Sequence, residues 1–175
     1  MDSDVQRHEA PSKSRDDDHS RPTKPELDLN QFLPYRLNSL ADRISQALSQ
    51  IYDESFGINV AEWRVLAWLS HRDVLTAKQI CEFTRMDKAR VSRAVQALEE
   101  RELIRRTQST SDQRVHYLHL TPAGEKLLGE LIPQAHAWET ELVSTLTAGE
   151  YRDLFNTMSK LERQLERLEE NTKTP

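Results

Sequence analysis

Apolar residues recur every three or four positions along much of this chain, which is the period of an amphipathic α-helix. The first apolar stripe, which runs from Leu33 to Ile51, is followed by Gly57. Glycine commonly ends helices because it adopts a left-handed backbone without strain. Pro34 falls in the first turn, where its missing N–H does no harm. We therefore expect a long helix that ends near Phe56, with an apolar stripe formed by Leu33, Leu37, Leu40, Ile44, Leu48 and Ile51.

A second apolar pattern begins after Asn59. Glu62 follows three residues later, and this is the spacing of a capping box, in which each side chain accepts a hydrogen bond from the other residue's backbone N–H. The predicted helix continues to about His71. Because it is apolar around much of its circumference, we expect it to be buried, with a core formed by Trp63, Val65, Leu66, Ala67 and Leu69.

Two short helices are predicted after the next cap. Thr76 and Gln79 again have the capping-box spacing, and they open a helix that turns Ile80 and Phe83 inward. The second helix runs from about residue 87 to residue 100, and one of its faces carries Val91, Val95 and Leu98.

The opposite face of this second helix is polar. At about 100° per residue, Ala89, Arg93 and Gln96 lie opposite the apolar stripe, with Arg90 and Ser92 on the flanks. Arginine can bond guanine with both prongs of its guanidinium, glutamine can bond adenine, and a helix N-terminus attracts phosphate. An ordinary amphipathic helix with a solvated face is the simpler interpretation of this pattern, so the helix by itself does not indicate DNA binding.

A basic β-hairpin is predicted directly after it. Residues 104–108 and 115–120 are strand-like, and residues 109–114 form a polar connection without glycine. Arg105 and Arg106 put positive charge along the hairpin, and Arg114 puts it at the tip.

An arginine at such a tip can enter a minor groove while the neighbouring helix occupies the major groove. Asp112 precedes Arg114 by two residues, where its carboxylate can hold the guanidinium in one orientation. Two short helices followed by a basic hairpin form a winged helix–turn–helix, so the segment from Thr76 to Leu120 indicates DNA binding.

Two further helices are predicted after the hairpin. Thr121 and Pro122 form a cap followed by a first-turn proline, and Pro133 is expected to kink or briefly break the helix that they open. Thr147 and Glu150 form a third capping box. The helix after it has a narrow stripe that repeats about every 3.5 residues, formed by Tyr151, Leu154, Met158, Leu161, Leu165 and Leu168. The first and last helices offer more apolar surface than a small winged domain covers, so we expect them to form an intermolecular bundle.

Composition narrows this picture. The chain has 175 residues and a net charge of −5, but residues 85–116 carry eight Lys and Arg against five Asp and Glu, a net +3. A local basic patch suffices for phosphate contacts. The single cysteine excludes an internal disulfide, and the sequence contains neither an 18-residue apolar run nor the apolar segment of a signal peptide. We expect a soluble, cytoplasmic protein with a disordered polar tail over residues 1–26.

The sequence resembles the MarR family of bacterial transcriptional regulators over residues 29–168. The resemblance is carried by the run DKARVSRAVQALEERELIRR, by the triplet DQR ending at Arg114 and by LTPAG at 120–124, in that order. It implies a mainly α fold, in which a winged helix–turn–helix lies between long N- and C-terminal helices that form a dimerisation domain. The expected parts are a tail at 1–26, a dimerisation helix at 27–57, a DNA-binding domain at 58–121, dimerisation helices at 122–170 and a short tail at 171–175.

The resemblance also implies a homodimer that reads a near-palindromic DNA operator, because two-fold protein symmetry requires a symmetric site. Arg93 and Gln96 are the candidates for base contacts. The candidates for phosphate contacts are Lys88, Arg90 and Ser92. In the wing, Arg114 would enter the minor groove with Asp112 as its positioning partner, and Arg105 and Arg106 either contact the backbone or are simply solvated.

Members of the family are usually repressors released by a small molecule, often an aromatic acid, a phenol or a related thioester. The resemblance therefore implies a pocket between the dimerisation helices and the winged lobe. Arg36 and Arg43 border the first apolar stripe, where either can meet an anionic group. Aromatic walls and a polar tip can come from Tyr35, Trp63, Trp68 and His71. A core role for both tryptophans, and solvation or pairing with an acid for the arginines, are the simpler interpretations.

Three alternatives remain open. A metal-sensing regulator is disfavoured because His116 and His119 lie three apart in a strand and point to opposite faces. A redox-sensing regulator would have to use Cys81, and the simpler interpretation of this residue is a small packed thiol. A dimeric adaptor that binds another protein would keep the fold without specific DNA binding. An enzyme is not expected, because the sequence offers no nucleophile–base set and no glycine-rich phosphate loop, and no cofactor is implied.

Overall fold

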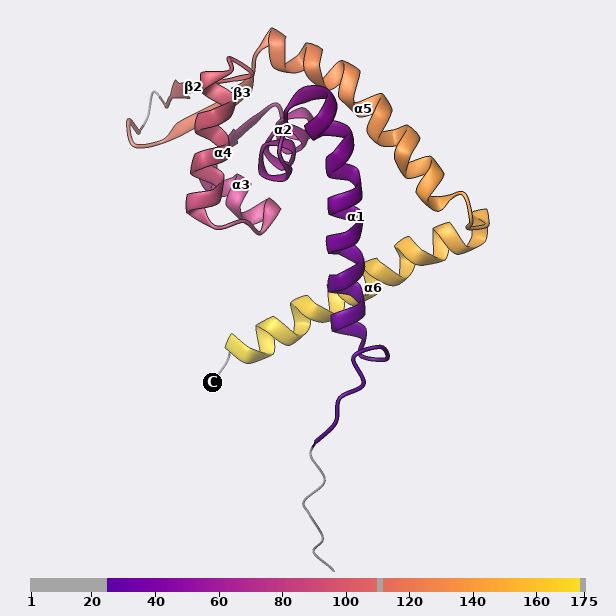
Figure 1. The fold of residues 1–175 in the computed structure, drawn as a ribbon. Coiled ribbons are helices and arrows are strands. Elements are labelled where there is room, and N and C mark those ends of the chain that lie inside the picture. Colours follow the sequence, from indigo (N-terminus) through magenta and orange to yellow (C-terminus); the bar gives the residue numbers. More distant parts are fainter. Residues whose placement is uncertain (1–24, 110–111, 174–175) are drawn as a thin grey trace, which may run out of the picture. The chain divides into compact units, whose positions relative to one another are not determined.

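The computed structural model describes residues 25–109 and 112–173, and the expected tail at residues 1–26 falls almost entirely outside this range. The described part is mainly helical with one small sheet (Figure 1). In chain order the elements are α1 Leu33–Phe56, α2 Val60–Arg72, β1 Val74–Thr76, α3 Ala77–Thr84, α4 Lys88–Glu100, β2 Ile104–Gln108, β3 His116–Leu120, α5 Pro122–Val143 and α6 Ala148–Lys173. This is the expected fold class.

A boundary between two compact units falls within α1, after Leu37. In the first unit, Asp28 organises the turn that precedes α1. Its carboxylate accepts the backbone N–H of Asn30 at 2.9 Å, and its carbonyl accepts that of Phe32 at 3.0 Å. Leu33, Tyr35 and Leu37 are all exposed. The second unit, residues 38–175, contains every remaining element.

The predicted capping residues begin their helices as expected. Asn59 and Glu62 form a complete capping box, in which the Asn59 side chain accepts from the backbone of Glu62 at 3.1 Å and Glu62 accepts from the backbone of Asn59 at 3.1 Å. Thr76 and Thr121 cap α3 and α5. Such caps satisfy N–H groups that a helix start leaves unpaired, so they fix where each helix begins.

The sheet contains three antiparallel strands in the order β1, β3, β2. Ile104 lies opposite Leu120, and Leu75 lies opposite Leu118. The strand β1 was not predicted, because three residues are too few to establish an alternating pattern, and its partner lies more than 40 residues further along the chain. Its pairing ties the start of the helix–turn–helix to the base of the hairpin.

The core of the second unit lies between α2, α3, α4, α5 and the sheet. Apolar residues from each element are buried in it, including Val65, Leu66, Leu69, Ile80, Val91, Leu98, Leu118 and Leu131. The prediction that Phe83 is also buried is wrong, because its side chain is 38% exposed. Its ring instead stacks on Trp68, with a centroid distance of 4.4 Å. The helix α3 has only eight residues, and Ile80 already fills its inward face.

The C-terminal helices can be compared with the prediction in two places, and the expected kink at Pro133 stays a prediction. The helix α5 continues without a break through Pro133, although proline cannot donate a hydrogen bond to Gly129 one turn earlier. The helix α6 reaches Lys173, three residues beyond the expected boundary at 170. No helix within the described ranges is long and apolar enough to cross a membrane.

Candidate nucleic-acid interface and apolar pocket

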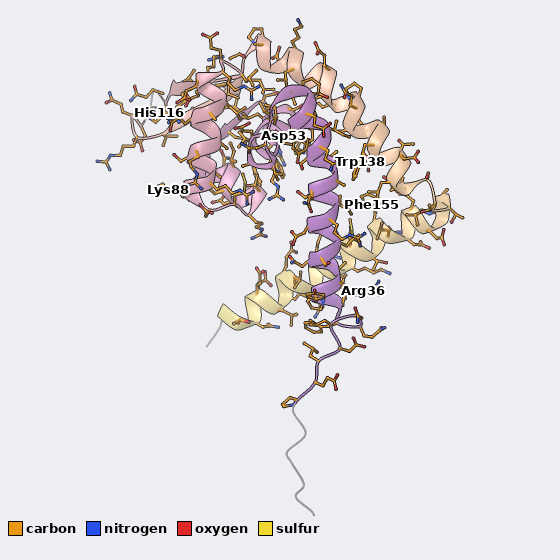
Figure 2. The ribbon with its side chains drawn as sticks, viewed as in Figure 1. Arg36, Asp53, Lys88, His116, Trp138 and Phe155 are labelled. Carbon is orange, nitrogen blue, oxygen red and sulfur yellow. The ribbon has the colours of Figure 1, made fainter. Side chains whose placement is uncertain are left out.

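The helix α4 presents one buried face and one exposed basic face. Val91, Ala94, Val95 and Leu98 are buried. On the other side, all five residues predicted to contact DNA are exposed, namely Lys88, Arg90, Ser92, Arg93 and Gln96. Figure 2 shows Lys88 at the start of the helix, with its side chain directed away from the core.

The N-terminal end of α4 is fixed by Asp87. Its carboxylate accepts the backbone N–H of Arg90 at 2.8 Å, and this bond, helped by the N–H of Ala89 and the charge of Arg93, holds the pKa of Asp87 below its ordinary value. The carboxylate is therefore ionised near neutral pH. It satisfies an N–H group at the start of the helix and sets where the exposed face begins.

On the exposed face of α4, Gln96 has a neighbour on the same helix, and Arg90 and Arg93 have neighbours on α2. The Gln96 side chain donates one of its two amide N–H groups to the Glu100 carboxylate at 2.9 Å. Arg90 and Arg93 border a hollow of about 510 Å³ whose other wall is the first turn of α2, residues 59–62. The basic face of α4 is thus continuous with the start of α2.

The hairpin is attached to α4 by an ion pair. Arg106 on β2 contacts the Glu99 carboxylate, with an Nε–Oε2 distance of 2.7 Å. The sequence left open whether Arg106 meets the DNA backbone or is solvated, whereas the structure pairs it with α4. Arg105 is exposed on the same strand. Burial and the Arg105 charge lower the pKa of His119, whose ring is bonded to the Thr107 hydroxyl at 2.8 Å.

At the tip of the hairpin, Asp112 shapes the backbone. Its carboxylate accepts the backbone N–H of Arg114 at 2.9 Å, and its carbonyl accepts the N–H of Val115 at 2.9 Å. The expectation that Asp112 orients the Arg114 guanidinium directly is therefore corrected: the bond is to the backbone. Arg114 is exposed at this turn. Residues 110 and 111, which complete the predicted connection, lie outside the described ranges.

An apolar pocket with a volume of about 680 Å³ lies among α1, α2, α5 and α6 of the second unit. Ile44 and Leu48 line it from α1, and Trp63 and Ala67 line it from α2. Figure 2 labels Trp138 and Phe155, which line it from α5 and α6. Pockets of this size and character suit small organic molecules.

The predicted ligand residues divide into three groups. Trp63 and His71 line the pocket. Trp68 is not part of its lining, because it stacks on Phe83 and meets the edge of His71 at 5.8 Å. Arg43 is exposed and is also absent from the lining. Tyr35 and Arg36 belong to the first unit, where both side chains are exposed.

The sequence did not identify three polar residues at the pocket. The Tyr151 hydroxyl donates to Glu139 at 3.4 Å, and Glu139 lies 3.5 Å from the ring nitrogen of His136. Burial and the Glu139 charge raise the pKa of Tyr151. The i, i+3 spacing of His136 and Glu139 was a readable signal, but their connection to Tyr151 depends on how α5 and α6 pack.

Cys81 is a half-buried free thiol. Over residues 25–109 and 112–173, no three His, Cys, Asp or Glu side chains are grouped so that they could hold a metal ion.

A family model described as MarR family matches residues 56–115. Among curated proteins, the chain is 29% identical to the uncharacterised HTH-type transcriptional regulator YwaE of Bacillus subtilis over 87 residues, which are 50% of this chain and 51% of YwaE. It is 31% identical to the HTH-type transcriptional regulator MhqR of Bacillus subtilis over 94 residues, 54% of this chain and 65% of MhqR. The matched region therefore spans less than two thirds of either relative.

A solved structure extends the likeness to most of the chain. The crystal structure of a MarR/EmrR family transcriptional regulator from Acinetobacter sp. ADP1 superposes with a TM-score of 0.73 at 28% identity. The match covers 81% of this chain and 99% of that one. All three of these proteins are named as transcriptional regulators, not as enzymes.

Proposed function

This chain belongs to the MarR family of transcriptional regulators, and from that premise we propose that it is a ligand-responsive repressor that binds a near-palindromic DNA operator as a homodimer. The observation that carries the proposal is the exposed basic face of α4, which is set by the Asp87 cap and supported by a buried apolar face. A transcriptional regulator of this kind acts on DNA in the cytoplasm.

The proposed DNA contacts follow from what the side chains are free to do. Arg93 and Gln96 would read base edges in the major groove, and Lys88, Arg90 and Ser92 would contact phosphates. The bond to Glu100 uses one of the two amide N–H groups of Gln96, so its second N–H and its carbonyl oxygen can pair with a base such as adenine.

The three arginines of the wing have different roles in this proposal. Arg114 would enter the minor groove from a turn that Asp112 holds in shape. Arg105 would contact the DNA backbone. Arg106 would act indirectly, because its ion pair with Glu99 fixes the angle between the wing and α4.

The proposed homodimer is supported by apolar surface that the described chain leaves exposed. On α6 this surface is formed by Leu154, Phe155, Met158, Leu161, Leu165 and Leu168. An apolar stripe of this length is unusual on a monomer and typical of an interface. We propose that residues 27–57 and 122–170 make the dimer and that residues 58–121 bind DNA.

The proposed effector is a small aromatic molecule with a polar or anionic substituent. The apolar walls of the pocket suit the aromatic part, and His71, His136 and the Glu139–Tyr151 pair supply polar groups. Ala135 lies in the lining and offers a test. Filling the space with Ala135→Phe is expected to abolish the response of DNA binding to any such effector, while binding without effector persists.

The DNA-binding proposal is tested by titrating the purified protein onto the DNA upstream of its own gene, and onto random DNA of the same length, at two salt concentrations. Arg93→Ala is expected to lower operator affinity about 5- to 100-fold and to relax base preference at one position, since a good base contact is worth about 1–3 kcal/mol. Arg114→Ala should weaken binding more evenly across sequences.

Arg163→Ala is the matched control, because Arg163 is exposed on the polar side of α6. It should change neither affinity nor sequence preference. Equal affinity of the unaltered protein for upstream and random DNA would contradict the proposal of a site-specific repressor and would favour a protein-binding adaptor.

A further inference from the structure

Arg101 joins the end of α4 to the end of α1. It is the residue that terminates α4, and its backbone N–H bonds the carbonyl of Ala97 at 3.2 Å. Its guanidinium reaches a segment more than 40 residues earlier in the chain. There Nη1 donates to the carbonyl of Gly57 and Nη2 to the carbonyl of Phe56, each at 2.8 Å. One rigid, two-pronged group thus bonds two successive carbonyls.

The receiving end of α1 is well suited to a cation. The last carbonyls of a helix have no partner within it and carry the negative end of the helix dipole. Gly57 adopts a left-handed backbone with φ of 60°, and the N–H of Ile58 bonds the carbonyl of Tyr52 at 2.9 Å. This turn presents the carbonyls of Phe56 and Gly57 together, in the spacing that a guanidinium matches.

Glu62 on α2 completes the contact. Its side chain is 8% exposed, and its carboxylate lies 3.8 Å from the Arg101 guanidinium. The backbone N–H and the side-chain amide of Asn59 also hold it, at 3.1 and 2.7 Å. A buried carboxylate without a cation is costly, so Arg101 stabilises the start of α2 as well as the end of α1. Three helices meet at this one side chain.

A continuous set of contacts leads from this point to the apolar pocket. Tyr52, one turn before Phe56 on α1, is 1% exposed and stacks on Trp63 with a centroid distance of 5.6 Å and an interplanar angle of 17°. Trp63 lines the pocket, as does Leu48 one turn earlier on α1. A molecule that moves either wall must therefore act on the helix whose end Arg101 holds.

We propose that Arg101 is a positioning residue for DNA recognition: it fixes the C-terminal end of α4 to α1 and α2, and through them couples the apolar pocket to the DNA-binding face. The inference rests on the proposed function. Arg101 itself need not touch DNA or effector. Shifting the end of α1 would tilt α4, because its other end is set independently by Asp87 and its middle is packed in the core.

The test uses the full chain with Arg101→Gln, which removes the charge and the two-pronged geometry, and Arg101→Lys, which restores the charge alone. Arg163→Gln is the charge-matched control. The pocket probe is anilinonaphthalene sulfonate, an aromatic anion that becomes fluorescent in apolar surroundings, with Ala135→Phe defining the signal that comes from the pocket. Each protein is titrated with upstream DNA and random DNA, with and without dye, and amide hydrogen exchange is measured on the free protein.

For the unaltered protein, we expect bound dye to lower the affinity for operator DNA by a factor of about 5 or more. Bound operator should lower the affinity for dye by the same factor, because coupling is reciprocal. In Arg101→Gln this factor should fall close to one, and the preference for upstream over random DNA should fall about tenfold, a loss of the size expected for a disturbed base contact. Arg101→Lys should recover part of both, and Arg163→Gln should match the unaltered protein. Exchange should rise at residues 57–59 and 101–103 while the core of α4 stays protected.

Different results would contradict the positioning role of Arg101 and the proposed repressor function. If Arg101→Gln keeps the coupling factor and sequence preference of Arg163→Gln, the role of Arg101 is overturned while the repressor remains. If the unaltered protein has no preference for upstream DNA, or if dye and DNA bind independently, the proposed function is overturned and the coupling with it. Exchange that rises throughout α4 would mean that Arg101 only stabilises the fold, which also overturns the positioning role.

Discussion

The helix α4 of the winged lobe, residues 58–121, and the last helix, α6, both carry an apolar stripe at helical spacing, but only the stripe on α4 is buried in the structure. In α4, Val95 and Leu98 are 1% and 0% exposed. In α6, Leu161 and Leu165 are 37% and 57% exposed. The difference lies in the neighbours that the chain provides to each helix, because both stripes are apolar and both follow a helical spacing.

The comparison shows what an amphipathic pattern predicts and what it leaves open. A periodic stripe predicts that a helix has an apolar face, but it does not say what covers that face. The neighbours α2, α3 and β2 cover α4 and turn its polar face outward. The stripe on α6 is exposed in the described part of the chain, and we propose that a second copy of this chain covers it.

Placing charge in the α6 stripe should have the largest effect. Leu161→Glu combined with Leu165→Glu is expected to raise the dissociation constant of the proposed dimer roughly a thousandfold, since two central interface residues worth about 2 kcal/mol each give that factor. Light scattering coupled to gel filtration would detect the monomer. Operator binding should fall with it, because one half-site contact would replace two.

The control for this variant adds the same charge to the polar side of α6. Asn156→Glu combined with Arg163→Gln should stay dimeric, since both residues are exposed away from the stripe. A double glutamate variant that remains dimeric and binds the operator normally would remove α6 from the dimer interface.

Deleting core volume in α4 should have the next largest effect. Leu98 is fully buried, so Leu98→Ala is expected to lower the free energy of unfolding by about 2–5 kcal/mol. Leu165→Ala, measured at protein concentrations low enough to keep the chain monomeric, should change it by less than about 1 kcal/mol. Urea unfolding followed by circular dichroism measures both. Equal losses would mean that α6 is covered within one chain.

Much of the fold follows from local patterns. The four helices with a predicted side-chain cap begin at that cap, because Asn59, Thr76, Thr121 and Thr147 each satisfy N–H groups within three residues of themselves. The exposed face of α4 was also predictable, since helical geometry alone places it opposite the apolar stripe. These features depend on short stretches of sequence.

What the sequence did not reveal depends on distant partners. Arg106 finds Glu99, and Arg101 finds the end of α1, only after the helices have packed. Gly124 is another case. A Cβ on this residue would lie 2.1 Å from the carbonyl oxygen of Leu103, so the LTPAG motif needs glycine to let α5 approach the backbone before β2. Periodicity carries no information on such contacts.

The capping boxes at Asn59 and Thr147 have the same local pattern but different surroundings, as do the stripes of α4 and α6. The box at Asn59 also holds Glu62 against Arg101, whereas the box at Thr147 is exposed and joins only Glu150. Asn59→Ala is therefore expected to lower the free energy of unfolding by about 1 kcal/mol or more, and Thr147→Ala by less. Thermal unfolding at neutral pH would compare them. A larger loss from Thr147→Ala would mean that Arg101 adds nothing to the start of α2.

The smallest expected effect is a pH dependence at the start of α6. The backbone N–H of Thr147, at 2.8 Å, and its hydroxyl lower the pKa of the Glu150 carboxyl below its ordinary value of 4.5. A lowered folded-state pKa stabilises the fold above the unfolded value, and this contribution is lost as the pH falls through the folded value. The melting temperature should therefore decline slightly more between about pH 5 and pH 3 in the unaltered protein than in Glu150→Gln, whose amide oxygen can still accept from Thr147 but does not titrate. Hydrogen exchange over residues 148–151 would localise the change. If exchange at that turn depends on pH identically in both proteins, the carboxylate does not set the start of α6, and the apolar stripe alone fixes its register.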